Sequence, residues 1–173
     1  MQDNQRQAVL WAYLAGLIDG EGSFVIQKTE VEKIAKSCNS KSPKYLAFFC
    51  IGMVDKAPLD LIRDTIGAGK VYEERVPNRR SIWRIRFGGR LKLMPFIKEL
   101  IPYLIVKKKQ AELMIEFCEK WVTTRNKLGQ TVITAPEELQ RREEAYQKMR
   151  KLNAVGAAAT TKPFCTRECE AIV

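Results

Sequence analysis

A helical pattern that ends in glycines and acids constrains this chain more than any other stretch of its sequence. Apolar residues recur at helical spacing over residues 6–19, which predicts a helix that the following glycines stop. Gly16 and Gly20 are four residues apart on one face, where small side chains let a second helix approach closely. Asp19 and Glu21 stand where the helix gives way to a strand. The pattern fits either a close helix pair with acids at its end or an amphipathic helix with a solvated acidic turn.

The chemistry open to such a segment is narrow. A glycine-rich nucleotide loop follows a strand and opens a helix, whereas this segment follows a helix and opens a strand, so that class is excluded. A close helix pair would bring two acidic ends together, and carboxylates with nearby waters form the oxygen site that Mg²⁺ prefers. The chain contains no histidine, so any catalysis must use carboxylates, lysine, metal and water.

The remaining pattern predicts an α+β fold with the order helix, strand, strand, helix, strand, strand, helix, and extra C-terminal helices. The four expected strands can form one antiparallel sheet, and they lie at residues 23–28, 45–53, 70–75 and 81–87. The later helices are expected from an Asp55 cap to Ile66, at residues 91–104 and 107–121, and from a capping-box pattern at Thr134 to about Asn153. Residues 1–153 then form one domain, and residues 154–173 a weakly ordered tail.

Charge and composition point to a polyanionic partner. The 173 residues carry 30 Lys and Arg against 20 Asp and Glu, a net charge of +10. A surplus of this size favours nucleic acid over a merely basic soluble protein. No apolar run reaches membrane-spanning length and the N-terminus lacks the pattern of a signal peptide, so we expect a location in the cytoplasm or an organelle matrix. Cys165 and Cys169 could share a helical turn, but two cysteines are too few for a zinc site.

The strand at residues 81–87 has a sharply divided pattern. Alternation places Arg84 and Arg86 on one face and Trp83, Ile85 and Phe87 on the other. The apolar side suits a core, and the arginine side suits base edges and phosphates, unless it is only a solvated surface. The residues expected to contact DNA are Gln27, Lys28, Lys44, Lys70, Tyr72, Glu74, Arg79, Arg80, Arg84 and Arg86.

The segment Leu14-Ala15-Gly16-Leu17-Ile18-Asp19-Gly20-Glu21-Gly22 closely resembles the signature of the LAGLIDADG family of homing endonucleases. The resemblance extends from about Val9 to Trp121, through Ile66-Gly67-Ala68-Gly69-Lys70-Val71 and Lys107-Lys108-Lys109-Gln110-Ala111. It implies a saddle-shaped antiparallel sheet that lies in the major groove. It also implies a homodimer of single-motif chains whose motif helices pair along the axis, with an interface at Val9, Tyr13, Gly16 and Gly20.

The same resemblance implies a catalytic site. Glu21 and the carbonyl of Gly20 would hold a divalent metal, Mg²⁺ above all, with Mn²⁺ or Ca²⁺ able to occupy the site. Lys107 would help to organise the attacking water and offset phosphate charge. Relatives often carry a polar residue, commonly Gln, where this chain has Met53. That departure puts one water-positioning contact in doubt, and Lys56 is a neighbour that could replace it.

The implied activity is site-specific cleavage of both strands of double-stranded DNA at a long pseudo-palindromic target, with 3′ extensions. Such an enzyme would be encoded by an intron or intein. Two alternatives stay open: a DNA-binding regulator of the same fold that does not cleave, and an RNA-binding intron maturase. Retention of the acid Glu21 favours the nuclease over the regulator.

Overall fold

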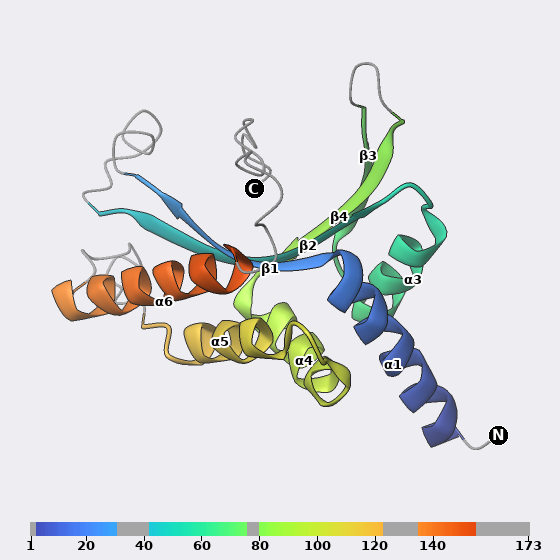
Figure 1. Cartoon of the computed structure of the whole chain (residues 1–173). Coiled ribbons are helices and arrows are strands. Elements are labelled where there is room, and N and C mark those ends of the chain that lie inside the picture. Colours follow the sequence, from blue (N-terminus) through green and yellow to red (C-terminus); the bar gives the residue numbers. More distant parts are fainter. Residues whose placement is uncertain (1–2, 31–41, 76–79, 123–134, 155–173) are drawn as a thin grey trace, which may run out of the picture.

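The computed structural model describes residues 3–30, 42–75, 80–122 and 135–154. Its centre is a four-stranded antiparallel sheet with the order β1-β2-β4-β3. The strands are β1 (Gly22–Thr29), β2 (Lys44–Met53), β3 (Lys70–Glu74) and β4 (Ile82–Gly88). Figure 1 shows that the sheet curves like a saddle, with the β1–β2 and β3–β4 ends rising on either side. The expected α+β class, the single four-stranded sheet and its saddle shape are therefore confirmed.

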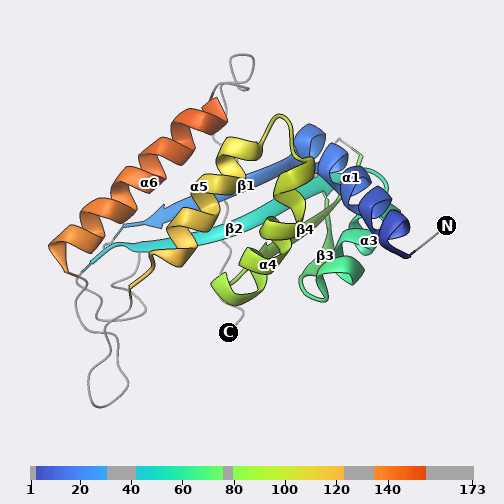
Figure 2. The same ribbon diagram turned by 90° about the horizontal axis from the view of Figure 1, so that it is seen from below.

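All the helices in the described residues lie on one side of this sheet (Figure 1). They are α1 (Asp3–Glu21), α3 (Ala57–Ile66), α4 (Arg90–Leu100), the 3₁₀ turn η1 (Ile101–Tyr103), α5 (Lys108–Glu119) and α6 (Pro136–Ala154). Seen from below, α6, α5 and α4 follow one another across the sheet, with α1 and α3 beyond α4 (Figure 2). The opposite face of the sheet, here called the open face, carries no helix of the described chain.

The strand register explains which face is buried. Phe24 lies opposite Phe49, which lies opposite Phe87, and Ile51 lies opposite Ile85. These five side chains are buried beneath the helices. Because side chains alternate along each strand, the intervening residues point to the open face. Burial of large apolar side chains on one face fixes the register, since a shift by one residue would turn all of them to solvent.

Three expected boundaries are corrected by the structure. The first helix does not stop at Gly20 but continues to Glu21, which makes this acid the last helical residue. The helix expected over residues 91–104 ends at Leu100 and passes into η1, where Pro102 has no N–H to continue the α-helical bonding. Asp55 is not the N-cap of α3, because Lys56 occupies that position. Asp55 still accepts a hydrogen bond from the backbone N–H of Ala57 at 3.0 Å.

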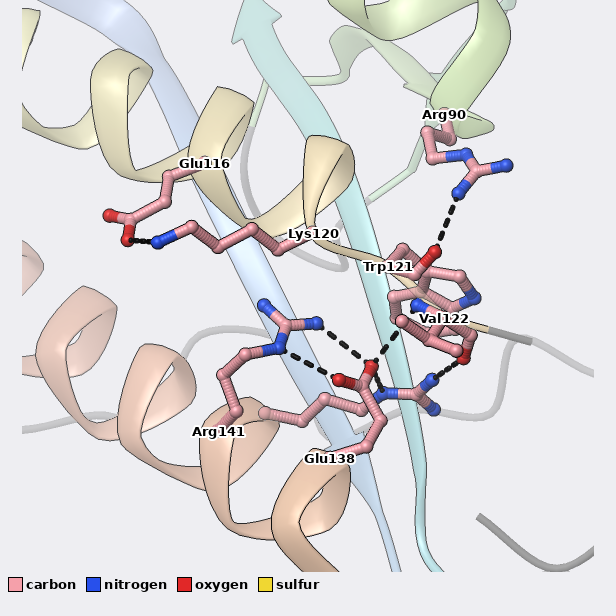
Figure 3. A network of polar contacts seen from close by, with 8 residues as sticks. Arg90, Glu116, Lys120, Trp121, Val122, Glu138 and Arg141 are labelled. Carbon is pink, nitrogen blue, oxygen red and sulfur yellow. Dashed lines mark hydrogen bonds and ion pairs between the residues drawn. The ribbon is translucent and has the colours of Figure 1, made fainter. Parts of the chain in front are cut away.

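A polar cluster joins the end of α5 to α6 (Figure 3). Arg142 is 6% exposed, its guanidinium lies 3.7 Å from the centre of the Trp121 ring, and it donates to Glu138 at 2.7 Å. Burial alone would raise the pKa of Glu138, but hydrogen bonds from Arg141 and Arg142 outweigh it and lower that pKa to about 2. This buried arginine joins α6 to the segment that follows α5 through the Val122 carbonyl and the Trp121 ring.

Some expectations lie outside the described residues. Among them are a DNA contact by Arg79, a capping residue at Thr134, and the tail with Cys165 and Cys169. No helix within the described ranges is both long enough and apolar enough to cross a membrane.

Candidate functional site

The C-terminal end of α1 is bonded to the segment that opens α5. Asp19 Oδ2 accepts hydrogen bonds from the backbone N–H groups of Ile105 at 2.8 Å and Val106 at 3.1 Å. Asp19 Oδ1 accepts a third from the N–H of Lys107 at 2.8 Å. These three N–H groups belong to the segment just before Lys108, the first residue of α5, and a carboxylate is a strong acceptor for backbone N–H groups. Asp19 therefore holds the start of α5 against the end of α1.

Lys107 completes this junction from the other side. Its ammonium donates to the carbonyl oxygens of Ile18 at 2.9 Å and Asp19 at 2.6 Å. A cation is favourable there because the carbonyl end of a helix carries partial negative charge. Burial lowers the pKa of Lys107, while the carboxylates of Asp19 and Glu21 act in the opposite direction. We call Asp19, Gly20, Glu21 and Lys107 the α1 foot.

Glu21 contrasts with Asp19, although the two acids are two residues apart. It is exposed at the end of α1. The next residue, Gly22, is buried and has no room for a side chain, because a Cβ there would lie 2.9 Å from both the Ile18 carbonyl oxygen and the Phe49 ring. The glycine after Glu21 thus lets the helix turn directly into β1. Glu21 is left at this corner, pointing away from the core.

One described chain does not assemble a complete metal site. Among its described residues no group of three or more His, Cys, Asp or Glu side chains could hold a metal ion. Glu21 and the Gly20 carbonyl supply oxygen donors, which suit Mg²⁺ or Ca²⁺.

The outward side of α1 is exposed and carries two glycines beside two apolar side chains. Val9 is 58% exposed and Tyr13 49%, and a Cβ built on Gly16 or Gly20 would meet no atom within 4 Å. These four residues follow helical spacing along a single face, opposite the buried Trp11, Leu14, Ala15 and Ile18. We call them the α1 stripe. It runs directly to Glu21, so the expected interface residues and the expected catalytic acid are contiguous.

The open face gathers most of the residues expected to contact DNA. The strand register places these residues on one side of the sheet: Gln27, Lys44, Lys70, Tyr72, Glu74, Arg84 and Arg86. Arg86 donates to Gln27 Oε1 at 3.0 Å across the sheet, and Arg84 forms an ion pair with Glu74. Arg80 is exposed just before β4. The sheet thus presents a charged and polar surface whose members contact one another.

Lys28 is the exception, because the structure places it on the helix-covered face. It lies opposite Tyr45, and its ammonium binds Glu143 of α6 at 3.0 Å and Glu30 at 3.1 Å. Hydrogen bonds to these two acids raise its pKa. Tyr45 also donates to Glu143 at 2.6 Å. Lys28 therefore fastens β1 to α6 and does not join the surface expected to contact DNA.

The structure also places Met53 and Lys56, the two positions at which the chain departs from its relatives or could compensate for that departure. Met53 lies opposite Trp83 and packs partly against the core. The amine of Lys56, its suggested replacement, binds Asp60 at 2.7 Å and lies 5.4 Å from the centre of the Trp83 ring. Both contacts of Lys56 lie on the helix-covered face of the sheet, beside α3.

Two apolar side chains on the open face, Leu46 and Phe48, were not predicted from the sequence. Phe48 lies beneath Arg86, with the guanidinium carbon 3.7 Å from the ring centre. Leu46 is 53% exposed on the same face, directly opposite Gln27 in the register. Alternation along β2 could have identified both, since they are two residues apart and out of phase with the buried Phe49 and Ile51.

Comparison with known proteins agrees with this geometry. The family model described as LAGLIDADG endonuclease matches residues 14–120, which includes the α1 foot, the sheet and all of α5. The chain belongs to the LAGLIDADG endonuclease family. The resemblance noted in the sequence is thereby confirmed, and so is the class of enzyme, a DNA endonuclease. No curated protein sequence matches the chain.

Solved structures of LAGLIDADG homing endonucleases share the fold. The homing endonuclease I-CvuI, in complex with DNA in the presence of Mg, is similar over 91% of this chain and 88% of its own, with 19% identity and a TM-score of 0.66. The archaeal intron-encoded I-Vdi141I, complexed with DNA, is similar over 96% and 91%, with 18% identity and a TM-score of 0.64. I-SmaMI bound to cleaved DNA is similar over 92% of this chain but only 51% of its own, with 20% identity and a TM-score of 0.55.

Proposed function

We propose that this LAGLIDADG endonuclease acts as a homodimer that hydrolyses both strands of a long, pseudo-palindromic DNA site with divalent metal ions. The observation that carries the proposal is the α1 stripe. This exposed helix face has room for a second helix to approach closely, and it ends beside Glu21. Pairing two stripes would place two Glu21 carboxylates near one axis. Each open face would then lie on one half of the target, as two-fold symmetry requires.

The dimer has support from packing and from chain length. Small residues at Gly16 and Gly20 allow helix backbones to approach closely, and Val9 and Tyr13 offer exposed apolar area beside them. The chain covers about half of I-SmaMI, which leaves that longer chain enough length for a second unit of similar size. A single-motif chain would reach the same arrangement by pairing with a copy of itself.

The residues of the α1 foot fit a hard cation. Glu21 and the Gly20 carbonyl offer oxygen donors, and no histidine competes for a softer metal. Bound divalent ions would lower the pKa of water and draw charge from the scissile phosphate. Glu21 would hold the ions, and Asp19 would keep the helix end in place through its three backbone contacts. Lys107, anchored on the Ile18 and Asp19 carbonyls, would offset negative charge beside Glu21.

The biological setting follows from the same likeness. I-Vdi141I is described as intron-encoded, and we infer that this chain is likewise encoded by an intron or intein and cuts the uninterrupted gene. We place it in the cytoplasm or an organelle matrix, wherever that gene lies.

The decisive test is cleavage of a randomised DNA library, with Mg²⁺ present, replaced by Ca²⁺, or removed by a chelator. We expect a double-strand cut at one class of sequence with Mg²⁺ and none without a divalent ion. Glu21→Gln keeps the shape of the side chain but removes its charge, so it should abolish cleavage while DNA binding persists. Glu99→Gln, at an exposed acid on α4, is the matched control and should cut normally. Cleavage by Glu21→Gln at the wild-type rate would overturn this metal site.

A further inference from the structure

The two arginines of β4 that reach the open face have different neighbours. Arg84 is paired with a carboxylate, Glu74 on β3. Arg86 has neutral contacts: its guanidinium carbon lies 3.7 Å from the centre of the Phe48 ring, and its Nη2 donates to Gln27 Oε1 at 3.0 Å. Glu74 therefore neutralises the charge of Arg84. The contacts with Phe48 and Gln27 hold Arg86 in place without neutralising its charge.

We propose that Arg86 reads a guanine in each half of the target, and that Phe48 and Gln27 are positioning residues that hold its guanidinium for this purpose. The inference rests on the proposed function, and it names the base that this part of the sheet would select in the target. A guanidinium carries five N–H donors in a planar fork, and guanine presents O6 and N7 as a matching pair of acceptors in the major groove. Gln27 uses one nitrogen of the fork, so other donors stay available for the base.

The surroundings of Arg86 favour selection over simple attraction. An arginine on a free stem must lose rotamer freedom when it binds, and stacking on an aromatic ring removes part of that cost in advance. Stacking on Phe48 holds the plane of the fork, and the bond to Gln27 sets its rotation within that plane. Two independent contacts thus define one orientation. A guanidinium held in one orientation distinguishes a base with two adjacent acceptors from a base with one. A cation on a mobile side chain binds any phosphate.

Arg84 lacks this arrangement. Its partner Glu74 competes for the donors that a guanine would need, and a carboxylate can itself accept from cytosine N4. We therefore expect Arg84 to select guanine less strongly than Arg86 does.

Leu46 adds a second element to the same region. It lies opposite Gln27 in the register and is 53% exposed on the face that would meet the groove. An exposed aliphatic side chain there suits the methyl group of thymine, which is the apolar feature of the major groove. We expect a thymine preference near the Arg86 guanine that depends on Leu46 and not on Arg86.

The test selects binding sites from a randomised library with the full chain in Ca²⁺, so that binding is separated from cutting. Arg86→Lys keeps the charge but loses the fork, and it should reduce guanine preference at one position per half-site by roughly 5- to 150-fold. Arg84→Lys is the matched control and should change preference less, at another position. Leu46→Ser should relax the thymine position and leave the guanine intact.

Positioning is tested through Arg86 itself. Phe48→Leu should lower the guanine preference, Phe48→Tyr should restore it, and Phe48→Leu should have no further effect on that preference in the Arg86→Lys background. Gln27→Met is a second route should Phe48→Leu fail to fold. Unchanged guanine preference in Arg86→Lys would overturn this inference while the proposed function stands. Failure of the wild-type chain to select any DNA would overturn both.

Discussion

The α1 foot and the open face of the sheet belong to one domain but hold their polar groups in different ways. At the foot, Asp19 accepts from three backbone N–H groups and Lys107 donates to two backbone carbonyls. On the open face, the contacts that define the surface join side chain to side chain, as between Arg86 and Gln27. Backbone partners cannot be exchanged by mutation, whereas side-chain partners can. The foot is therefore built for one geometry, and the face can accept many sequences.

The largest effect is expected from Gly16→Leu. In one chain a Cβ there meets nothing within 4 Å, so a leucine side chain should still allow each subunit to fold. It would separate two paired helices, however, and cleavage should fall more than about a thousandfold, because an enzyme's whole acceleration is lost when its site is not assembled. Light scattering and a cleavage assay measure the two effects. Gly16→Ala, which adds one methyl group, should give a milder defect, and a fully active Gly16→Leu dimer would refute the helix pairing.

The next effect concerns the backbone contacts of the foot. Asp19→Asn replaces one acceptor oxygen by a donor, so at least one N–H of residues 105–107 loses its partner. The free energy of unfolding should fall by about 1–3 kcal/mol, and cleavage should fall with it because the backbone of Lys107 is held less firmly against the end of α1. Denaturant unfolding and cleavage rates give both numbers. Asp64→Asn, at an exposed acid of α3, should change stability by less than about 0.5 kcal/mol.

A smaller effect is expected on the open face. Glu74→Gln removes the charge that pairs with Arg84, and an ion pair near the surface contributes only about 0–1 kcal/mol to stability, although this one is partly buried. Folding should be nearly unchanged, while DNA affinity rises and preference shifts at one base position per half-site. Glu73→Gln is the control, since that residue lies on the other face of β3 and pairs with Arg75. Equal changes in DNA affinity in both variants would mean that the net charge of β3 determines the affinity, and not the face on which the acid lies.

The smallest effect is expected at Arg80, exposed before β4. Arg80→Ala should weaken binding to all sequences alike and reduce the slope of log affinity against log salt by about one per subunit. Titrations at several salt concentrations measure this slope. Arg63→Ala, on α3 beneath the sheet, removes the same charge and should leave the slope as it is. A change in base preference in Arg80→Ala would make this residue a reader and not a phosphate contact.

Much of this comparison was accessible from the sequence, because it depends on local pattern. Alternation placed Arg84 and Arg86 on one face, and helical spacing placed Gly16 and Gly20 on another, as the structure has them. Lys28 directly follows Gln27, so alternation alone already places the two on opposite faces. What the sequence does not show is the partner of Lys28, Glu143, which lies 115 positions along the chain on α6. The bonds of Asp19 to residues 105–107 were missed for the same reason. A pattern reports which side a residue faces and not which distant segment meets it.

The tight corner at Gly22 has a consequence for spacing along the DNA. With no room for a Cβ between the Ile18 carbonyl and the Phe49 ring, the axis of α1 cannot pivot freely against β1. In a dimer paired through α1, the separation and twist between the two sheets are then fixed by the protein. One inserted base pair would shift the half-sites by about 3.4 Å and rotate them by about 34°, the angle per base pair of a helix with roughly 10.5 per turn. We therefore expect a target whose half-sites tolerate several substitutions, but whose central spacer tolerates no change of length.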